Sequence, residues 1–243
     1  MCLLFIMVPL LNLLASTEIS AFKKTLRDEE VWQAILTTLK GAGLSTATGL
    51  VLGVPLAYCL SEMEFKGKKV VESIINIPIV IPHVAVGIIL LKLLNSNSPF
   101  GKIFSKFGIS FVDTICGIAV AMCFVSISYS ISSSLLGFRS INKELVWTAR
   151  SLGAPPVEVF KRVIFPLALP YILRGAILSF ARAVSEVGAL LIIAYYPKTA
   201  PILMLERFEN YGLKASTPIA VLVVLISLLI FVLFLSIPLG KEK

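Results

Sequence analysis

The chain reads Asn142-Lys-Glu-Leu-Val-Trp-Thr-Ala-Arg-Ser-Leu-Gly153 at the start of its longest polar interruption, a pattern typical of a short surface helix. Asn142 suits the N-cap, and Glu144 and Arg150 lie in the first and last turns, where each charge complements the helix dipole. Gly153 suits the left-handed residue that ends a helix. We expect a helix-turn-helix elbow at a membrane surface, with Pro166 interrupting the chain before the next apolar run.

The chain as a whole is too apolar for a soluble globular domain, with 57% hydrophobic residues, 15% charged residues and a mean hydropathy of +0.94. A helix needs roughly 20 apolar residues to cross the hydrocarbon core of a bilayer. The composition therefore predicts an all-α polytopic protein of the cell membrane, a single domain over 1–243 with about six spanning helices. The predicted spans are 1–16, 32–60, 70–94, 115–136, 171–196 and 218–239.

The first run is short, and a cleaved signal peptide or a late start codon is an alternative interpretation of 1–16. The loop 137–170 then lies between the fourth and fifth spans. The basic cluster from Lys66 to Lys69 and the acidic run from Asp28 to Glu30 favour a cytoplasmic N-terminus, which places this loop in the cytoplasm.

The formal charge of +8 does not indicate nucleic acid, because the basic residues are scattered between apolar runs. The four cysteines have no CxxC spacing, and the single histidine offers no partner for a metal site. We expect no metal site and no catalytic residues.

One face of the predicted surface helix is amphipathic. Leu145, Thr148, Ala149 and Leu152 fall at i, i+3, i+4 and i+7. This face can pack on the protein's own helices, lie in the lipid headgroups or dock on another protein. The small residues Ala149 and Gly153 fit a close protein contact better than lipid anchoring, which prefers bulky aromatics.

At these residues the sequence resembles the "EAA" cytoplasmic loop of ABC importer permeases. The resemblance is carried by Trp147-Thr148-Ala149, by Gly153 and by Val163-Ile164-Phe165-Pro166, with departures at Trp147, Thr148 and Phe165. It implies a coupling helix that docks on a cytoplasmic ATPase. The residues implied in coupling are Leu145, Trp147, Thr148, Ala149, Leu152, Gly153 and Pro166.

No Gly-x4-Gly-Lys-Ser/Thr phosphate loop occurs in the chain. We therefore expect a transport subunit that is not itself an enzyme, with ATP and Mg²⁺ bound by separate ATPase subunits.

Two charges lie inside the predicted fifth span. Arg182 and Glu186 are four residues apart, on one face of a helix, and an ion pair is the least costly arrangement for them in a membrane. Together with Ser185 they are candidates for the transport pathway. A purely structural ion pair and direct contact with the substrate both remain open.

The predicted third span contains Pro78 and Pro82, directly followed by His83. Broken backbone at membrane depth is tolerated where it lines a cavity or is buried in protein. These residues are candidates for a pathway wall. Ser126 opens a series of hydroxyls in the fourth span, which can line a polar path or permit close helix packing.

A second resemblance concerns the substrate. The stretch Ala181-Arg-Ala-Val-Ser-Glu-Val-Gly-Ala189, the stretch Tyr195-Tyr-Pro197 and the run from Pro201 to Phe208 resemble molybdate/tungstate permeases of the archaeal type. The resemblance implies a homodimer that works by alternating access, with two ATPase subunits and an external binding protein for a tetrahedral oxyanion. Lys102, Lys198 and Arg207 are the candidates for docking this binding protein. The alternatives are a permease for sulfate, phosphate or another small solute, and an ion-coupled carrier that needs no ATPase.

Overall fold

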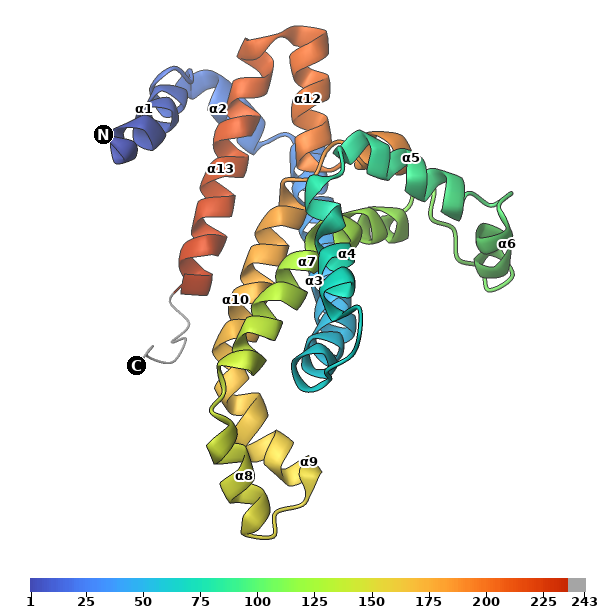
Figure 1. The fold of residues 1–243 in the computed structure, drawn as a ribbon. Coiled ribbons are helices and arrows are strands. Elements are labelled where there is room, and N and C mark those ends of the chain that lie inside the picture. Colours follow the sequence, from blue (N-terminus) through green and yellow to red (C-terminus); the bar gives the residue numbers. More distant parts are fainter. Residues whose placement is uncertain (236–243) are drawn as a thin grey trace.

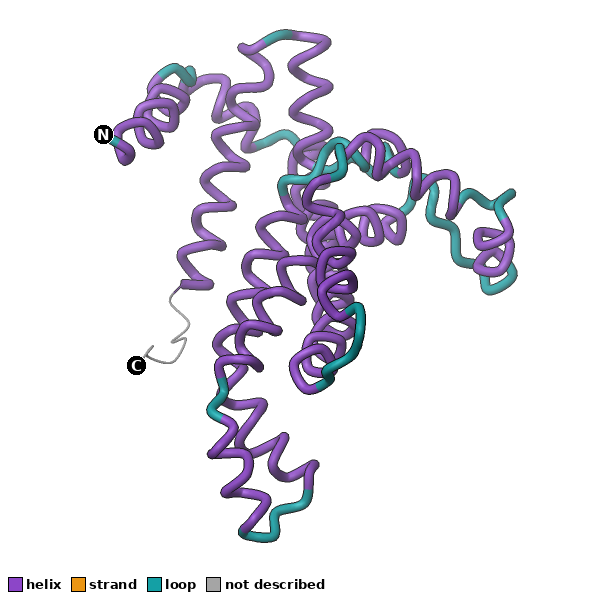
Figure 2. Tube along the Cα trace, in the orientation of Figure 1, coloured by secondary structure: helices purple, strands orange, loops and turns teal. Residues whose placement is uncertain are grey.

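The structure is a computed structural model that describes residues 1–235, and these residues form helices and turns without any strand (Figure 2). The predicted all-α class is confirmed. The helices, in chain order, are α1 Cys2–Ala15, α2 Ile19–Leu26, α3 Glu29–Glu62, α4 Lys68–Val80, α5 His83–Leu94, α6 Pro99–Ser105, α7 Ile115–Ser140, α8 Lys143–Ser151, α9 Pro156–Val159, the π-helical turn Phe160–Ile164, α10 Phe165–Val184, α11 Leu190–Ile193, α12 Ala200–Tyr211 and α13 Leu213–Leu235.

Helices α3, α7 and α10 pack side by side as the centre of the bundle (Figure 1). Their contact faces carry small buried side chains, among them Ala42, Ser45, Ala121, Ser126 and Ala183. Small side chains let helix backbones approach closely, which is the usual source of helix association in a membrane. The α8–α9 hairpin projects from one end of this bundle, and α12 and α13 meet at the other end.

Four helices are long and apolar enough to cross a membrane: Glu29–Glu62, Ile115–Ser140, Pro156–Val184 and Leu213–Phe234. Two further pairs meet the same criterion only as bent spans, Leu3–Ala15 with Ile19–Leu26 at 84° and Lys68–Val80 with His83–Leu94 at 108°. The described part of the chain thus has up to six spans. The predicted last span, 218–239, extends past residue 235 and so lies partly outside the described residues.

The predicted third span, 70–94, is divided into two helices, α4 and α5, which meet at 108° next to one of the two prolines expected to weaken it. Ile81 is extended, with φ −67° and ψ 134°, and Pro82 is the N-cap of α5. A proline disfavours helical backbone at the residue before it, which explains the break between Ile81 and Pro82. Pro78, in contrast, is accommodated and buried inside α4.

The predicted fifth span, 171–196, also ends too late. Helix α10 stops at Val184, and Ser185 to Ala189 leave the helical path before the single turn of α11. The side chain of Glu186 accepts the Ala189 N–H, at 2.8 Å, so a carboxylate replaces the carbonyl that a continuing helix would supply. The two predicted spans therefore end or bend in the middle of apolar sequence.

The predicted interruption at Pro166 is wrong. Pro166 lies in the first turn of α10, and the chain is helical from Pro156 to Val184. The π-helical turn Phe160–Ile164 directly precedes α10. A wider turn relieves the clash that a proline ring makes with the preceding turn, so the helix continues through Pro166.

Candidate functional site

The breaks in α4–α5 and after α10 lie at the same level of the bundle. Both α4 and α10 run from the end nearest α8–α9 toward the end where α12 and α13 meet (Figure 1). Helix α4 ends at Val80 and α10 ends at Val184, and His83 and Glu186 lie just past these two ends, with their side chains 2.6 Å apart. The side chains at the two breaks are therefore able to meet.

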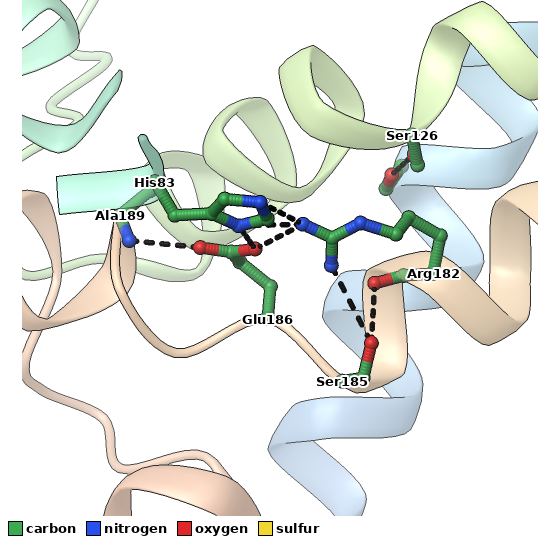
Figure 3. Close-up of polar contacts among 7 residues, drawn as sticks. His83, Ser126, Arg182, Ser185, Glu186 and Ala189 are labelled. Carbon is green, nitrogen blue, oxygen red and sulfur yellow. Dashed lines mark hydrogen bonds and ion pairs between the residues drawn. The ribbon is translucent and has the colours of Figure 1, made fainter. Parts of the chain in front are cut away.

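Glu186 is the centre of this junction, and its side chain is fully buried. One carboxylate oxygen, Oε2, lies 2.6 Å from His83 Nδ1 and 2.9 Å from Arg182 Nη2 (Figure 3). The other, Oε1, accepts the N–H of Ala189. The contact with His83 is a hydrogen bond to an ionised carboxylate in the tautomer that carries the proton on Nδ1. We name His83, Arg182 and Glu186 the break cluster.

The guanidinium of Arg182 lies against the imidazole ring of His83. Its Nη2 atom is 2.5 Å from Nδ1 and 2.9 Å from Nε2, although the lone-pair directions of these two ring nitrogens diverge. Its Nη1 atom is 3.4 Å from Ser185 Oγ, and that hydroxyl donates to the Arg182 carbonyl at 3.0 Å. The carboxylate of Glu186 therefore holds the guanidinium in place, and the imidazole ring lies beside it.

Two glycines allow the backbones to approach at this junction. A Cβ atom on Gly188 would lie 2.8 Å from His83 Cβ, and one on Gly87 would lie 2.7 Å from the carbonyl oxygen of Ala189. Neither position tolerates a side chain without movement, and at Gly87 the obstacle is backbone. Helix α5 is thus held directly against the segment that follows α10.

Gly87→Ala is expected to lower the stability of the chain by about 1–3 kcal/mol, because the added methyl group would overlap the Ala189 backbone. The thermal unfolding temperature of the detergent-solubilised protein measures the effect. Gly43→Ala is the matched control, since a Cβ there meets open space on α3 and alanine favours a helix. Equal unfolding temperatures for the two variants would show that α5 does not pack tightly against the backbone at Ala189.

The break cluster contains part of the predicted pathway set. The predicted ion pair between Arg182 and Glu186 is confirmed at 2.9 Å, although Glu186 lies beyond the end of α10 and not on the helix face that the prediction assumed. His83 and Ser185 join the pair, and Pro82 lies at the adjacent break. Pro78 and Ser126 contribute no contact to the cluster.

The hydroxyls of α7 lie between helices. Ser126 Oγ is 3.2 Å from Ser45 Oγ of α3, and the Ser128 hydroxyl donates to the Ile75 carbonyl of α4. Ser133 donates to the Tyr171 carbonyl of α10. Of the two interpretations offered by the sequence, these contacts favour close helix packing over a polar path.

The α8 helix has well-defined ends. Asn142 Oδ1 accepts the Glu144 N–H at 2.8 Å, and Gly153 is left-handed with φ 87°. The Ala154 N–H donates to the Ala149 carbonyl, which completes a Schellman C-cap. The predicted start and stop of this helix are therefore confirmed.

The predicted amphipathic stripe on α8 is divided in the structure. Ala149 packs, with Val146, against the cluster around Val159 and Ile164. Leu145 and Leu152 are exposed by 52% and 83%. The remaining members of the coupling set, Trp147, Thr148, Gly153 and Pro166, are also exposed. The tip of the hairpin thus presents large apolar side chains that no part of residues 1–235 covers.

A second polar cluster joins α12 to the start of α3. Lys198 Nζ lies 2.8 Å from Glu30 and 2.9 Å from Glu206, and Arg207 Nη2 lies 2.6 Å from Glu30 and 3.3 Å from Asp28. Burial opposes the charge of Lys198, but the two carboxylates outweigh burial and raise its pKa above the ordinary lysine value. These ion pairs hold the α12 segment on α3.

Lys198 and Arg207 were predicted only as docking cations. Both pair with Glu30, across 168 and 177 residues, and so large a separation leaves no local signal of the pairing, whereas Glu206 lies only eight residues from Lys198. Lys102 lies elsewhere, exposed on α6. No group of three or more His, Cys, Asp or Glu residues suited to a metal ion occurs within residues 1–235.

Comparison with known proteins identifies several relatives. The family model described as "Binding-protein-dependent transport system inner membrane component" matches residues 49–238. The molybdate/tungstate transport system permease protein WtpB of Pyrococcus furiosus is 45% identical over 215 residues, 88% of this chain and 81% of that protein. The sulfate transport system permease protein CysT of Synechocystis sp. is 33% identical, over 77% of this chain and 68% of that protein. A bacterial alginate ABC transporter, solved with an alginate pentasaccharide-bound periplasmic protein, shares the fold with a TM-score of 0.74 at 20% identity, over 96% and 88% of the two chains.

Proposed function

The chain belongs to the family of binding-protein-dependent transport system inner membrane components, and from this we propose that it is the membrane-spanning subunit of an ATP-driven importer of molybdate and tungstate. The proposed substrate is supported by the 45% identity, across most of both chains, to a relative that is named for these two oxyanions. The sulfate relative is more distant, at 33%.

The exposed tip of the α8–α9 hairpin supports a partnership with an ATPase. Leu145, Trp147 and Leu152 expose large apolar surfaces on a short helix that has no buried residue of its own. Exposed apolar patches of this kind mark sites of protein contact. The chain also lacks a phosphate loop, so ATP and Mg²⁺ belong to the partner.

We place two copies of the chain with two cytoplasmic ATPase subunits and an external binding protein. The helical segment Pro156–Val184 then connects the α8–α9 hairpin, where the ATPase would dock, with the break cluster inside the membrane. At ~1.5 Å per residue it is about 42 Å long, and it reaches from the ATPase side to Arg182 in the break cluster. Closure of the ATPase subunits would move the hairpin, and this lever would carry the motion to the helix breaks.

Uptake into liposomes tests the proposal. The complex of this chain with its ATPase and binding protein is expected to accumulate labelled tungstate and molybdate only when ATP is supplied, and faster than sulfate. Faster uptake of sulfate than of tungstate would contradict the substrate and favour the sulfate alternative. Uptake without the ATPase subunit would instead favour an ion-coupled carrier.

A further inference from the structure

Arg182 uses only part of its capacity to donate hydrogen bonds. A guanidinium carries five N–H donors. Nη2 contacts Glu186 at 2.9 Å, whereas Nη1 reaches Ser185 Oγ only at the long distance of 3.4 Å. Within residues 1–235 the Nε atom has no hydrogen-bond partner. The N–H donors on Nη1 and Nε are therefore available at the break cluster, on a guanidinium whose charge Glu186 balances.

The break cluster has one buried side and one exposed side. Glu186 is completely buried and its oxygens are occupied by Arg182, His83 and the Ala189 N–H. The side chains of Arg182 and His83 are 19% and 38% exposed, and Ser185 is exposed. An anion that approaches from the open side meets the guanidinium and the hydroxyl first, with the carboxylate behind them.

The open side of the cluster continues along one face of α10. The residues Leu178, Ala181 and Ser185 follow each other at helical spacing, and all are exposed. A charged group that faces lipid near the middle of a bilayer costs about 2.5–3.5 kcal/mol or more. Ala181 and Ser185 also line a largely apolar cavity together with Phe231 and Phe234 of α13, so part of this face is turned toward the chain's own helices and not toward lipid.

We propose that Arg182 and Ser185 form a transient binding site for a tetrahedral oxyanion on the transport path, with Glu186 and His83 as positioning residues. The proposal rests on the proposed function. One oxygen of such an anion would accept a charge-assisted hydrogen bond from the Nη1 group of Arg182, and a second would accept one from the Ser185 hydroxyl. Because Glu186 neutralises Arg182, the site attracts the anion weakly, as passage requires.

The double variant Arg182→Gln/Glu186→Gln separates this role from a structural one. It removes both charges together and leaves no unpaired charge inside the protein, so the complex is expected to assemble. Tungstate uptake is expected to fall about tenfold or more, because a charge-assisted contact with the anion is lost. ATP hydrolysis stimulated by the loaded binding protein is measured on the same liposomes, because it distinguishes the loss of an anion contact from the loss of coupling.

A matched control makes the same exchange at another ion pair. Arg139 of α7 lies 2.6 Å from Glu72 of α4, near the opposite end of α4 from the break. Arg139→Gln/Glu72→Gln is expected to keep uptake within about twofold of the parent, as surface ion pairs contribute little. Uptake by the Arg182/Glu186 double variant at the parent rate would show that the pair is structural and overturn the site. Loss of stimulated ATP hydrolysis together with uptake would assign the pair to coupling and also overturn it.

Ser185→Ala decides the question if the double variant does not assemble. The hydroxyl is exposed and its removal leaves the buried pair intact. Uptake of tungstate is expected to fall by about threefold, the loss of one hydrogen bond to the anion, and an unchanged rate would overturn the site. A parent complex that transports no oxyanion would instead refute the proposed function.

Discussion

Gly153→Asp is expected to abolish ATP-driven uptake while leaving the chain inserted in the membrane. Gly153 has φ 87°, a conformation that aspartate tolerates better than most residues, so α8 should still end at the same place. No atom of the chain lies within 4 Å of a Cβ at this position. The added carboxylate would therefore project into space outside the chain, where the ATPase subunit is proposed to dock.

Uptake and ATP hydrolysis measured on the same liposomes test this expectation. Uptake is expected to fall by tenfold or more, the effect of one buried unpaired charge at a close protein interface. Gly67→Asp is the matched control, because Gly67 is also left-handed, at φ 97°, and also has open space at its Cβ. Undiminished uptake by the Gly153 variant would rule out a close contact at the end of α8.

Glu186→Ala is expected to destabilise the chain by about 3–5 kcal/mol, the range for removing one partner of a buried ion pair. Glu186 is fully buried, and without it the Arg182 guanidinium has no counter-ion among the residues described. The Ala189 N–H also loses its acceptor. The two helix breaks would then lose the group that joins them.

Thermal unfolding of the solubilised complex measures this loss. Glu209→Ala serves as a control, because Glu209 is exposed on α12 and such surface changes usually stay within about 0.5 kcal/mol. Glu186→Gln, which also leaves Arg182 without a counter-ion, should lower the unfolding temperature. The double variant Arg182→Gln/Glu186→Gln should regain much of that loss. An equal unfolding temperature for the Glu186 and Glu209 variants would mean that water or another group already neutralises Arg182.

These two expectations concern the two ends of the path from α8 to the break cluster. Gly153 ends the helix that enters the hairpin, and Arg182 lies at the far end of Pro156–Val184. The π-helical turn near Pro166 is the irregular point along this segment. In the proposed coupling, this helix would carry a displacement of the hairpin to the break cluster.

Much of the fold was predictable because its signals are local. Asn142 and Gly153 define α8 through contacts with their own neighbours, and these were predicted correctly. The apolar runs also predicted a membrane-spanning protein, because the length and hydropathy of a run are local properties of the sequence. Pro78, Pro82 and Pro166 show the limit of local signals, because only Pro82 breaks a helix, whereas the structure accommodates the other two.

Local patterns in the sequence were enough to predict the membrane environment, the all-α class, the ends of α8 and the ion pair between Arg182 and Glu186, whose partners are four residues apart. The packing of distant helices, in contrast, brings His83 to this pair across 103 residues and Lys198 to Glu30 across 168. The physical reason is that a buried charge requires a counter-charge but does not specify which one. The packing of α4 and α5 against the end of α10 makes that choice, and it turns a predicted ion pair into a junction between two broken helices.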